Sequence, residues 1–103
     1  MTRILYMVAA TLPDEATARE YVAWLEDGHV DQVIDGGAHT GMIVRIEGAP
    51  GDPPRVETHY VFATRERYEA YLATHADALR AEGLKKFPPG RGIRFERRLG
   101  EIV

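Results

Sequence analysis

The fold of this chain is decided by the stretch from Tyr68 to Phe87, which reads YEAYLATHADALRAEGLKKF. Its apolar positions recur at the i, i+3, i+4, i+7 spacing of a helix that lies with one face on an apolar layer. The residues of this stripe are Tyr68, Tyr71, Leu72, His75, Ala76 and Leu79. Thr64 is expected to cap the start of the helix by accepting from a free backbone N–H, and Gly83 is expected to end it. The pattern therefore predicts one long helix with a single polar residue, His75, inside its apolar stripe.

The rest of the chain alternates between strand and helix patterns. Residues 4–10 are apolar at every position, as in a strand that is covered on both faces. Residues 14–34 carry a helical stripe that Gly28 interrupts, and Thr11 is expected to cap this helix. Further strands are expected at residues 40–47, 55–63 and 93–103, and irregular links at residues 48–54 and 87–92, where Gly and Pro dominate.

The resulting order, β-α-β-β-α-β, is the split βαβ arrangement of ferredoxin-like α+β folds. Right-handed crossovers place both helices on one face of a four-stranded antiparallel sheet. The first strand is apolar on the other face as well, and leaving such a face in water is unfavourable by about 25 cal/mol per Å². We therefore expect residues 1–103 to form a single domain that pairs sheet to sheet with a second copy, as a homodimeric α+β barrel.

Length and composition narrow the class of protein. The chain has 103 residues, 45% hydrophobic and 28% charged, which is ordinary for one soluble globular domain. A net charge of −3, with no aromatic residue between its basic pairs, argues against a nucleic-acid partner. No apolar run approaches the roughly 20 residues that span a membrane, and the charged PDE segment at residues 13–15 argues against a signal peptide. With no cysteine and no membrane partner, a cytoplasmic location is expected.

Charge is divided unevenly along the chain. Residues 14–35 hold seven acidic side chains and one basic, whereas residues 80–98 hold seven basic and two acidic. The favoured interpretation is two solvated faces with local ion pairs, and Arg97 with Arg98 is expected to form a solvated strand edge. The alternative is a basic mouth for an anionic ligand beside the Pro-Gly loop. That mouth would be formed by Lys85, Lys86, Arg91 and Arg94.

Two histidines are the candidate catalytic or ligand-anchoring residues. His29 and His75 each lie on the apolar side of a predicted helix, so both are expected to face the sheet over one cavity. Each is either a buried histidine that hydrogen-bonds to backbone or tyrosine, or a neutral imidazole that acts as a general base or ligand anchor. No catalytic residue is assigned beyond these two candidates. The predicted ligand-binding residues are Tyr6, Trp24, His29, Tyr60, Phe62, Tyr71 and His75.

Other kinds of site have little support in the sequence. Glu26 and His29 form a single Glu-x-x-His pair, whereas a carboxylate di-iron site needs two such pairs and further glutamates, so no metal is expected. The sequence holds no Gly-rich phosphate loop, no G-x-S-x-G elbow and no cysteine nucleophile. No cofactor is expected. Haem, with His29 or His75 as axial ligand, is the alternative that a coloured protein would support.

The run YLATHADALRAEGLKKF at residues 71–87 resembles the uncharacterised bacterial domain of unknown function family 4286. YVAWLEDGHV at residues 21–30 and FERRLGEIV at residues 95–103 are further matches, so the resemblance covers almost the whole chain. It implies the dimeric α+β barrel superfamily, which includes cofactor-independent oxygenases, polyketide cyclases and haem proteins similar to chlorite dismutase. The loop at residues 88–92 departs from the family. Because fold analogy does not establish a reaction, no catalytic residue is carried over.

Three functions are open on the sequence. The leading one is binding of a small organic molecule in a pocket between the sheet and the helices. The second is a cofactor-independent oxygenase, cyclase or isomerase, in which His29 or His75 abstracts a proton and Tyr6 or Tyr60 stabilises the oxyanion. The third is a structural domain without a ligand. A cavity of at least about 300 Å³ with a histidine in its wall favours the first two, and a packed interior favours the third.

Overall fold

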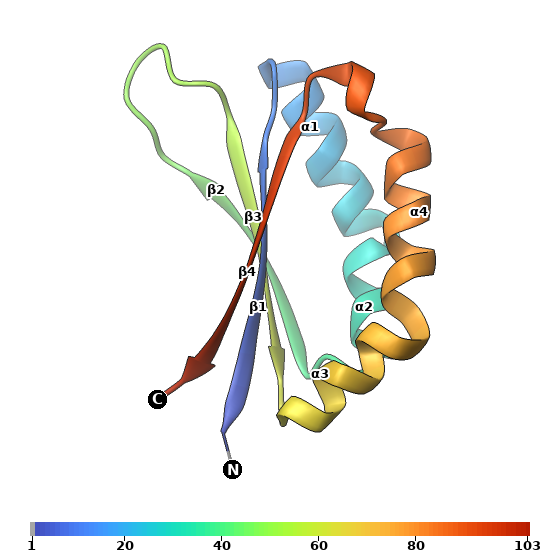
Figure 1. Cartoon of the computed structure of the whole chain (residues 1–103). Helices are drawn as coiled ribbons and strands as arrows, with labels where there is room; N and C mark the ends of the chain where they lie inside the picture. The colour runs from blue at the N-terminus through green and yellow to red at the C-terminus, as the bar shows by residue number, and fades with distance from the viewer. Residues whose placement is uncertain (1) are drawn as a thin grey trace.

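The computed structural model describes residues 2–103 as an open sheet with helices on one side (Figure 1). The strands are β1 (Arg3–Thr11), β2 (Thr40–Ile46), β3 (Arg55–Phe62) and β4 (Arg94–Ile102). The helical segments are α1 (Glu15–Trp24), η1 (Leu25–His29), α2 (Val30–Asp35), α3 (Arg65–Tyr71), η2 (Leu72–Ala76), α4 (Asp77–Lys86) and η3 (Pro89–Arg91). Among the described residues, no helix is long and apolar enough to cross a membrane.

The sheet confirms the ferredoxin-like topology expected from the sequence. Its strand order is β2-β3-β1-β4, and every neighbouring pair is antiparallel. The register places Tyr6 of β1 opposite Tyr60 of β3 and Leu99 of β4, so these side chains share one face. All the long helices lie on that face, and the opposite face of the sheet is open (Figure 1).

Two helical arms cover the sheet. The first arm, residues 15–35, bends at η1, where Asp27 (φ −84°, ψ 21°) and Gly28 (φ 134°) leave helical geometry. This confirms the interruption predicted at Gly28, since glycine is the residue that reaches such a φ without steric cost. The second arm, residues 65–86, passes through the π-helical turn η2 without a break. The arms therefore carry the same kind of sequence stripe with different local geometry.

The start of each arm is fixed by a side-chain cap. The Thr64 hydroxyl accepts from the backbone N–H of Arg67 at 3.2 Å, as predicted. The prediction of Thr11 as the other cap is wrong, because Thr11 is the last residue of β1. Asp14 caps the first arm instead, accepting from the N–H of Thr17 at 2.7 Å, and this hydrogen bond lowers the pKa of Asp14. A carboxylate at this position also meets the positive end of the helix dipole.

The second arm ends later than predicted. Gly83 lies inside α4, which continues to Lys86 with Phe87 as its C-cap. The close approach of the two arms explains a glycine here, because a Cβ at Gly83 would lie 3.2 Å from Cη2 of Trp24 in the first arm. The link that follows was expected to be irregular, but it contains the short 3₁₀ helix η3 and turns at Gly92 with φ 79°.

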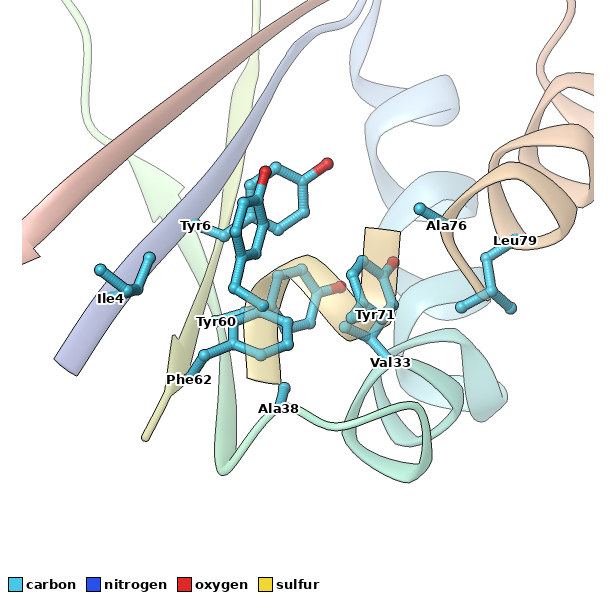
Figure 2. Close-up of a cluster of buried hydrophobic side chains, with 10 residues drawn as sticks. Ile4, Tyr6, Val33, Ala38, Tyr60, Phe62, Tyr71, Ala76 and Leu79 are labelled. Atoms are coloured by element: carbon cyan, nitrogen blue, oxygen red, sulfur yellow. The ribbon is translucent and has the colours of Figure 1, made fainter. Parts of the chain in front are cut away.

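The core between the sheet and the arms consists of two clusters. The first lies toward the start of β1, and Figure 2 shows its side chains pointing toward one another from the strands and the arms. Its members are Ile4, Tyr6, Val33, Ala38, Tyr60, Phe62, Tyr68, Tyr71, Ala76 and Leu79. The second lies toward the end of β1 and comprises Ala10, Leu12, Ala18, Tyr21, Leu25, Val56, Phe87 and Ile93. The space where these clusters meet holds the candidate site.

The open face of the sheet carries mainly apolar side chains on β1 and β2 and mainly charged ones on β3 and β4. The register turns these apolar side chains away from the helices: Leu5, Met7, Ala9, Met42, Val44, Ile46 and Val61. Met42 is 57% exposed and Ile46 39% exposed. On the same face, the Glu57 carboxylate accepts from Nε of Arg55 at 3.0 Å and lies 3.0 Å from Nε2 of His59. Glu57 and His59 therefore lie on the central strand β3, between the apolar side chains of β1 and β2. Exposed apolar residues such as Met42 on the same face are typical of a protein interface.

Candidate functional site

A cavity of about 210 Å³ lies between the sheet and the two arms, at the junction of the two core clusters. It is lined by Tyr6, Val8, Tyr21, Trp24, Leu25, His29, Val33, Thr58, Tyr60, Tyr71, Leu79, Arg80, Gly83, Leu84, Phe87, Phe95 and Arg97. Leu84 is 51% exposed, so the cavity reaches solvent beside α4. Its volume falls short of the roughly 300 Å³ that drug-sized ligands occupy, which limits an occupant to about one or two rings.

His29 lies in the wall of this cavity, as predicted. Its ring stacks on Trp24 with the centroids 4.1 Å apart, and its Nδ1 is buried with no hydrogen-bond partner among the described residues. Burial lowers the pKa of His29 from 6.5 to about 4. The imidazole is therefore neutral at physiological pH, with a buried nitrogen whose hydrogen-bonding capacity is unused.

His75 lies outside the cavity. Its side chain is exposed, and its Nδ1 is 2.7 Å from the Thr74 hydroxyl. The predicted stripe fails here because η2 is π-helical and takes up an extra residue, so the buried face resumes at Ala76, five residues after Tyr71. The His75 ring instead packs beside Gly36, where an added Cβ would lie 3.0 Å from its Cγ. The structure does not bring the two histidines together.

Four of the predicted aromatic residues, Tyr6, Trp24, Tyr60 and Tyr71, line the cavity, whereas Phe62 does not. Phe62 is fully buried in the first cluster, with its ring centroid 5.4 Å from that of Tyr71 (Figure 2). It therefore supports the wall from behind. Ligand binding by the residues of the wall stays a prediction.

One end of the cavity carries positive charge. The Tyr6 hydroxyl accepts from Nη2 of Arg80 and from Nε of Arg97, each at 3.2 Å. Arg80 belongs to α4 and Arg97 to β4, so the guanidinium groups approach the hydroxyl from opposite walls. Nε of Arg80 is buried without a partner, and within residues 2–103 no carboxylate lies within 4.0 Å of either guanidinium. The hydrogen bond to Tyr6 raises the pKa of Arg80 above its usual value.

The other tyrosines of the wall are held in the protonated form. Burial raises the pKa of both Tyr21 and Tyr71 to about 12, and it raises the pKa of Tyr60 as well. Desolvation disfavours the charged phenolate in each case. At physiological pH these residues can offer O–H donors to a ligand, but they cannot act as anionic bases.

Arg80 and Arg97 are site residues that the sequence pattern does not single out. Arg97 and Arg98 are both exposed on the edge strand β4, as expected, but the register turns Arg98 to the open face and Arg97 to the helix-covered face, where it borders the cavity. A signal for this was present, since Arg97 lies in strict alternation between Phe95 and Leu99 and so occupies an inward position of the strand. No comparable signal marks Arg80, whose place depends on the approach of α4 to β1.

The Pro-Gly loop is ion-paired to the first arm. Arg91 donates to both carboxylate oxygens of Glu20, at 2.7 and 3.2 Å, and to the carbonyl oxygen of Lys86 at 3.1 Å. These contacts lower the pKa of Glu20. The acidic first arm and the basic C-terminal segment thus pair locally, as the favoured interpretation of the charge pattern predicts. Among the described residues, no group of three His, Asp or Glu side chains is placed to hold a metal ion.

Comparison with known proteins gives a family and a fold. The model described as Domain of unknown function (DUF4286) matches residues 3–102, and no curated protein matches the chain. A dimeric ferredoxin-like protein from an uncultured marine organism has a TM-score of 0.74 at 16% identity, covering 100% of this chain and 97% of that one. An ethyl tert-butyl ether d (EthD) family protein from Bacillus halodurans has a TM-score of 0.67 at 17% identity, covering 100% of each chain.

A third similar structure carries a stated activity. SnoaB, a cofactor-independent oxygenase from Streptomyces nogalater, has a TM-score of 0.57 at 11% identity, covering 100% of this chain and 93% of that one. At such identities the likeness establishes the fold alone, because one fold supports many unrelated reactions.

Proposed function

The chain belongs to the DUF4286 family, and we propose that it is a homodimeric protein that binds a small organic molecule in the cavity between the sheet and the helical arms. The observation that carries this proposal is the cavity itself, about 210 Å³ of space between the sheet and the arms that opens to solvent beside Leu84. Native interiors are close-packed and hold few voids larger than a water molecule. The volume is below the roughly 300 Å³ expected from the sequence for a binding cavity, so we confine the proposal to a small ligand.

The walls indicate a flat ligand. The ring centroid of Phe87 lies 5.4 Å from that of Tyr21 and 5.5 Å from that of Trp24, so three aromatic rings surround one part of the space. An apolar cavity of about 150 Å³ is already large enough to bind benzene. A one-ring or two-ring aromatic compound therefore suits this volume, whereas a larger polycyclic compound would require the arms to move apart.

Blocking the mouth tests the proposal. Leu84→Trp places a large side chain at the half-exposed mouth, and Leu72→Trp is the matched control, since Leu72 is 36% exposed on the same arm and does not line the cavity. We expect small aromatic acids, amides and alcohols that raise the melting temperature of the wild type to bind the control equally well. Their affinity for Leu84→Trp should fall by at least about ten-fold, as the contact area is lost. Equal binding by both variants would contradict the proposal, and so would a screen without any binder.

Catalysis by proton abstraction is the second candidate function, and the unpartnered imidazole of His29 is the observation that favours it. A pKa of about 4 makes His29 a weak base in the empty cavity, since general bases work best with a pKa near the operating pH. Each binder should be incubated with the protein in air while oxygen uptake and the ligand spectrum are followed. Turnover that His29→Phe abolishes, with binding retained, would support an oxygenase, cyclase or isomerase. An unchanged ligand would leave binding as the function.

The homodimer is supported by the exposed apolar side chains on the open face of the sheet. Burial of this face against a second copy would remove Met42 and Ile46 from water. A charged residue at either position should therefore strongly disfavour dimer formation. Light scattering should give about twice the chain mass of 11.5 kDa for the wild type. Met42→Glu should shift this mass to that of one chain, whereas Leu72→Glu on the helical side should leave it unchanged. A wild-type mass of one chain at micromolar concentration would refute the dimer.

A further inference from the structure

We propose that the cluster of Tyr6, Arg80 and Arg97 is a carboxylate subsite, so that the ligand of the cavity is a small aromatic acid with its acid group at the β1–β4 end. This inference rests on the proposed function and gives its ligand a chemical class. Its basis is an excess of positive charge and of hydrogen-bond donors at one end of an otherwise apolar space.

The first step of the inference concerns charge. Each guanidinium is permanently charged, and both donate to one phenol oxygen without a carboxylate within 4.0 Å in residues 2–103. Arg97 is exposed and Arg80 is half-buried, so both can be solvated by water while the cavity holds no ligand. A ligand that displaces this water leaves two like charges together, which is unfavourable unless the ligand brings an anionic group. The other arginines near the cavity differ in this respect, since Arg91 is fully engaged with Glu20.

The second step concerns donors. The Tyr6 oxygen accepts two hydrogen bonds, which leaves its own O–H to donate, and Nε–H of Arg80 is buried without an acceptor. The guanidinium groups hold further N–H donors and no acceptor. A group that satisfies this set must bring several acceptor lone pairs and negative charge. A carboxylate does both, and its planar shape matches the fork of a guanidinium.

The third step concerns the rest of the ligand. The aromatic walls around Trp24 and Phe87 require an apolar, flat body, and the volume of about 210 Å³ limits it to about one or two rings. An inorganic anion would satisfy the arginines but leave the aromatic part of the cavity empty. An aromatic carboxylate fills both parts of the cavity.

Benzoate and benzamide form a suitable probe pair, because they share size and shape and differ in charge. Trp24 is the sole tryptophan of the chain and lines the cavity, so its fluorescence reports occupancy. We expect benzoate to bind wild type at least about ten-fold more tightly than benzamide, as charge-assisted hydrogen bonds are stronger than neutral ones. Arg80→Gln and Arg97→Gln should each weaken benzoate by about ten-fold and change benzamide by less than about two-fold.

Arg98→Gln is the matched control, because Arg98 neighbours Arg97 on β4 but faces the open side of the sheet. It should change neither affinity, and thermal unfolding of all three variants should show intact folding. Tyr6→Phe, which keeps the ring and removes the O–H, should weaken benzoate alone.

The outcomes separate this inference from the proposed function. Equal binding of benzoate and benzamide, blocked by Leu84→Trp, would overturn the carboxylate subsite and keep small-molecule binding. An equal loss of benzoate affinity in Arg98→Gln and Arg97→Gln would also overturn the subsite, since general surface charge would then explain the preference. Absence of binding by both probes at millimolar concentration would overturn the subsite and count against the cavity as a binding site.

Discussion

The two helical arms have similar sequence patterns but differ in how each treats its histidine. In the first arm the chain leaves helical geometry at Gly28, and the next residue, His29, stacks on Trp24 in the cavity wall. In the second arm the helix continues through the π-helical turn, and His75 rotates out to the surface beside Gly36. In each arm, the local helical geometry just before the histidine thus determines whether its imidazole faces the cavity or the surface.

The largest expected effect comes from removing the bend of the first arm. Gly28→Val forces a β-branched residue to φ 134°, where no atom within 4 Å would obstruct its Cβ, so the cost is one of backbone strain. We expect the free energy of unfolding to fall by about 2–3 kcal/mol in urea denaturation. Ala23→Val, at an exposed site in the same arm, controls for β-branching and should cost less than about 1 kcal/mol. Equal losses would mean that the bend does not distinguish the arms.

The next effect is a pH dependence of stability at His29. Between pH 6.5 and about 4 the unfolded chain binds a proton at His29 that the folded protein does not, so stability must fall as pH falls through this window. After allowance for partial exposure, the loss should be roughly 2 kcal/mol.

Denaturant titrations at several pH values measure this loss. His29→Phe keeps an aromatic ring on Trp24 and should remove that part of the acid destabilisation. His75→Phe is the matched control for introducing a phenylalanine, because it leaves His29 and its contact with Trp24 in place. A wild-type profile that His29→Phe does not alter would show that burial of His29 does not disfavour its charged form.

The smallest effect tests the packing of His75 against the first arm. A Cβ at Gly36 would lie 3.0 Å from Cγ of His75 and 3.1 Å from Cδ1 of Tyr71, so Gly36→Ala should cost about 1 kcal/mol. His75→Ala alone should cost less than about 0.5 kcal/mol, as for most surface changes. In the double variant about half of the Gly36→Ala loss should return, since Tyr71 stays in place. Strict additivity of the two changes would exclude this contact.

Several features of the site follow from local pattern. Alternation in β1 and β3 places Tyr6 and Tyr60 on the helix-covered face, and the helical stripe of the second arm places Tyr71 above them. The same alternation in β4 places Arg97 on the helix-covered face. These residues are predictable because strand parity depends only on neighbouring residues in the chain.

Other features depend on contacts between distant segments. Thr11 and Asp14 both carry a side-chain oxygen that can cap a helix, and Asp14 is the residue that does so. Thr11 stays in the strand because β1 pairs with β3 and β4 as far as this residue. Glycine is common at helix ends, but Gly83 lies inside a helix, at the point where the Trp24 ring of the first arm comes close to the backbone. Local preference is weak beside tertiary packing in such cases.

The sequence by itself determined the order of strands and helices, the ferredoxin-like topology and the apolar character of both faces of β1, because these depend on periodicity along the chain. Only the tertiary structure decided that His29 enters the cavity while His75 leaves it, and that Arg80 meets Arg97 at the Tyr6 hydroxyl. The physical reason is that helical phase across a π-turn and the meeting of side chains from separate elements are set by packing in three dimensions, which one-dimensional spacing does not record.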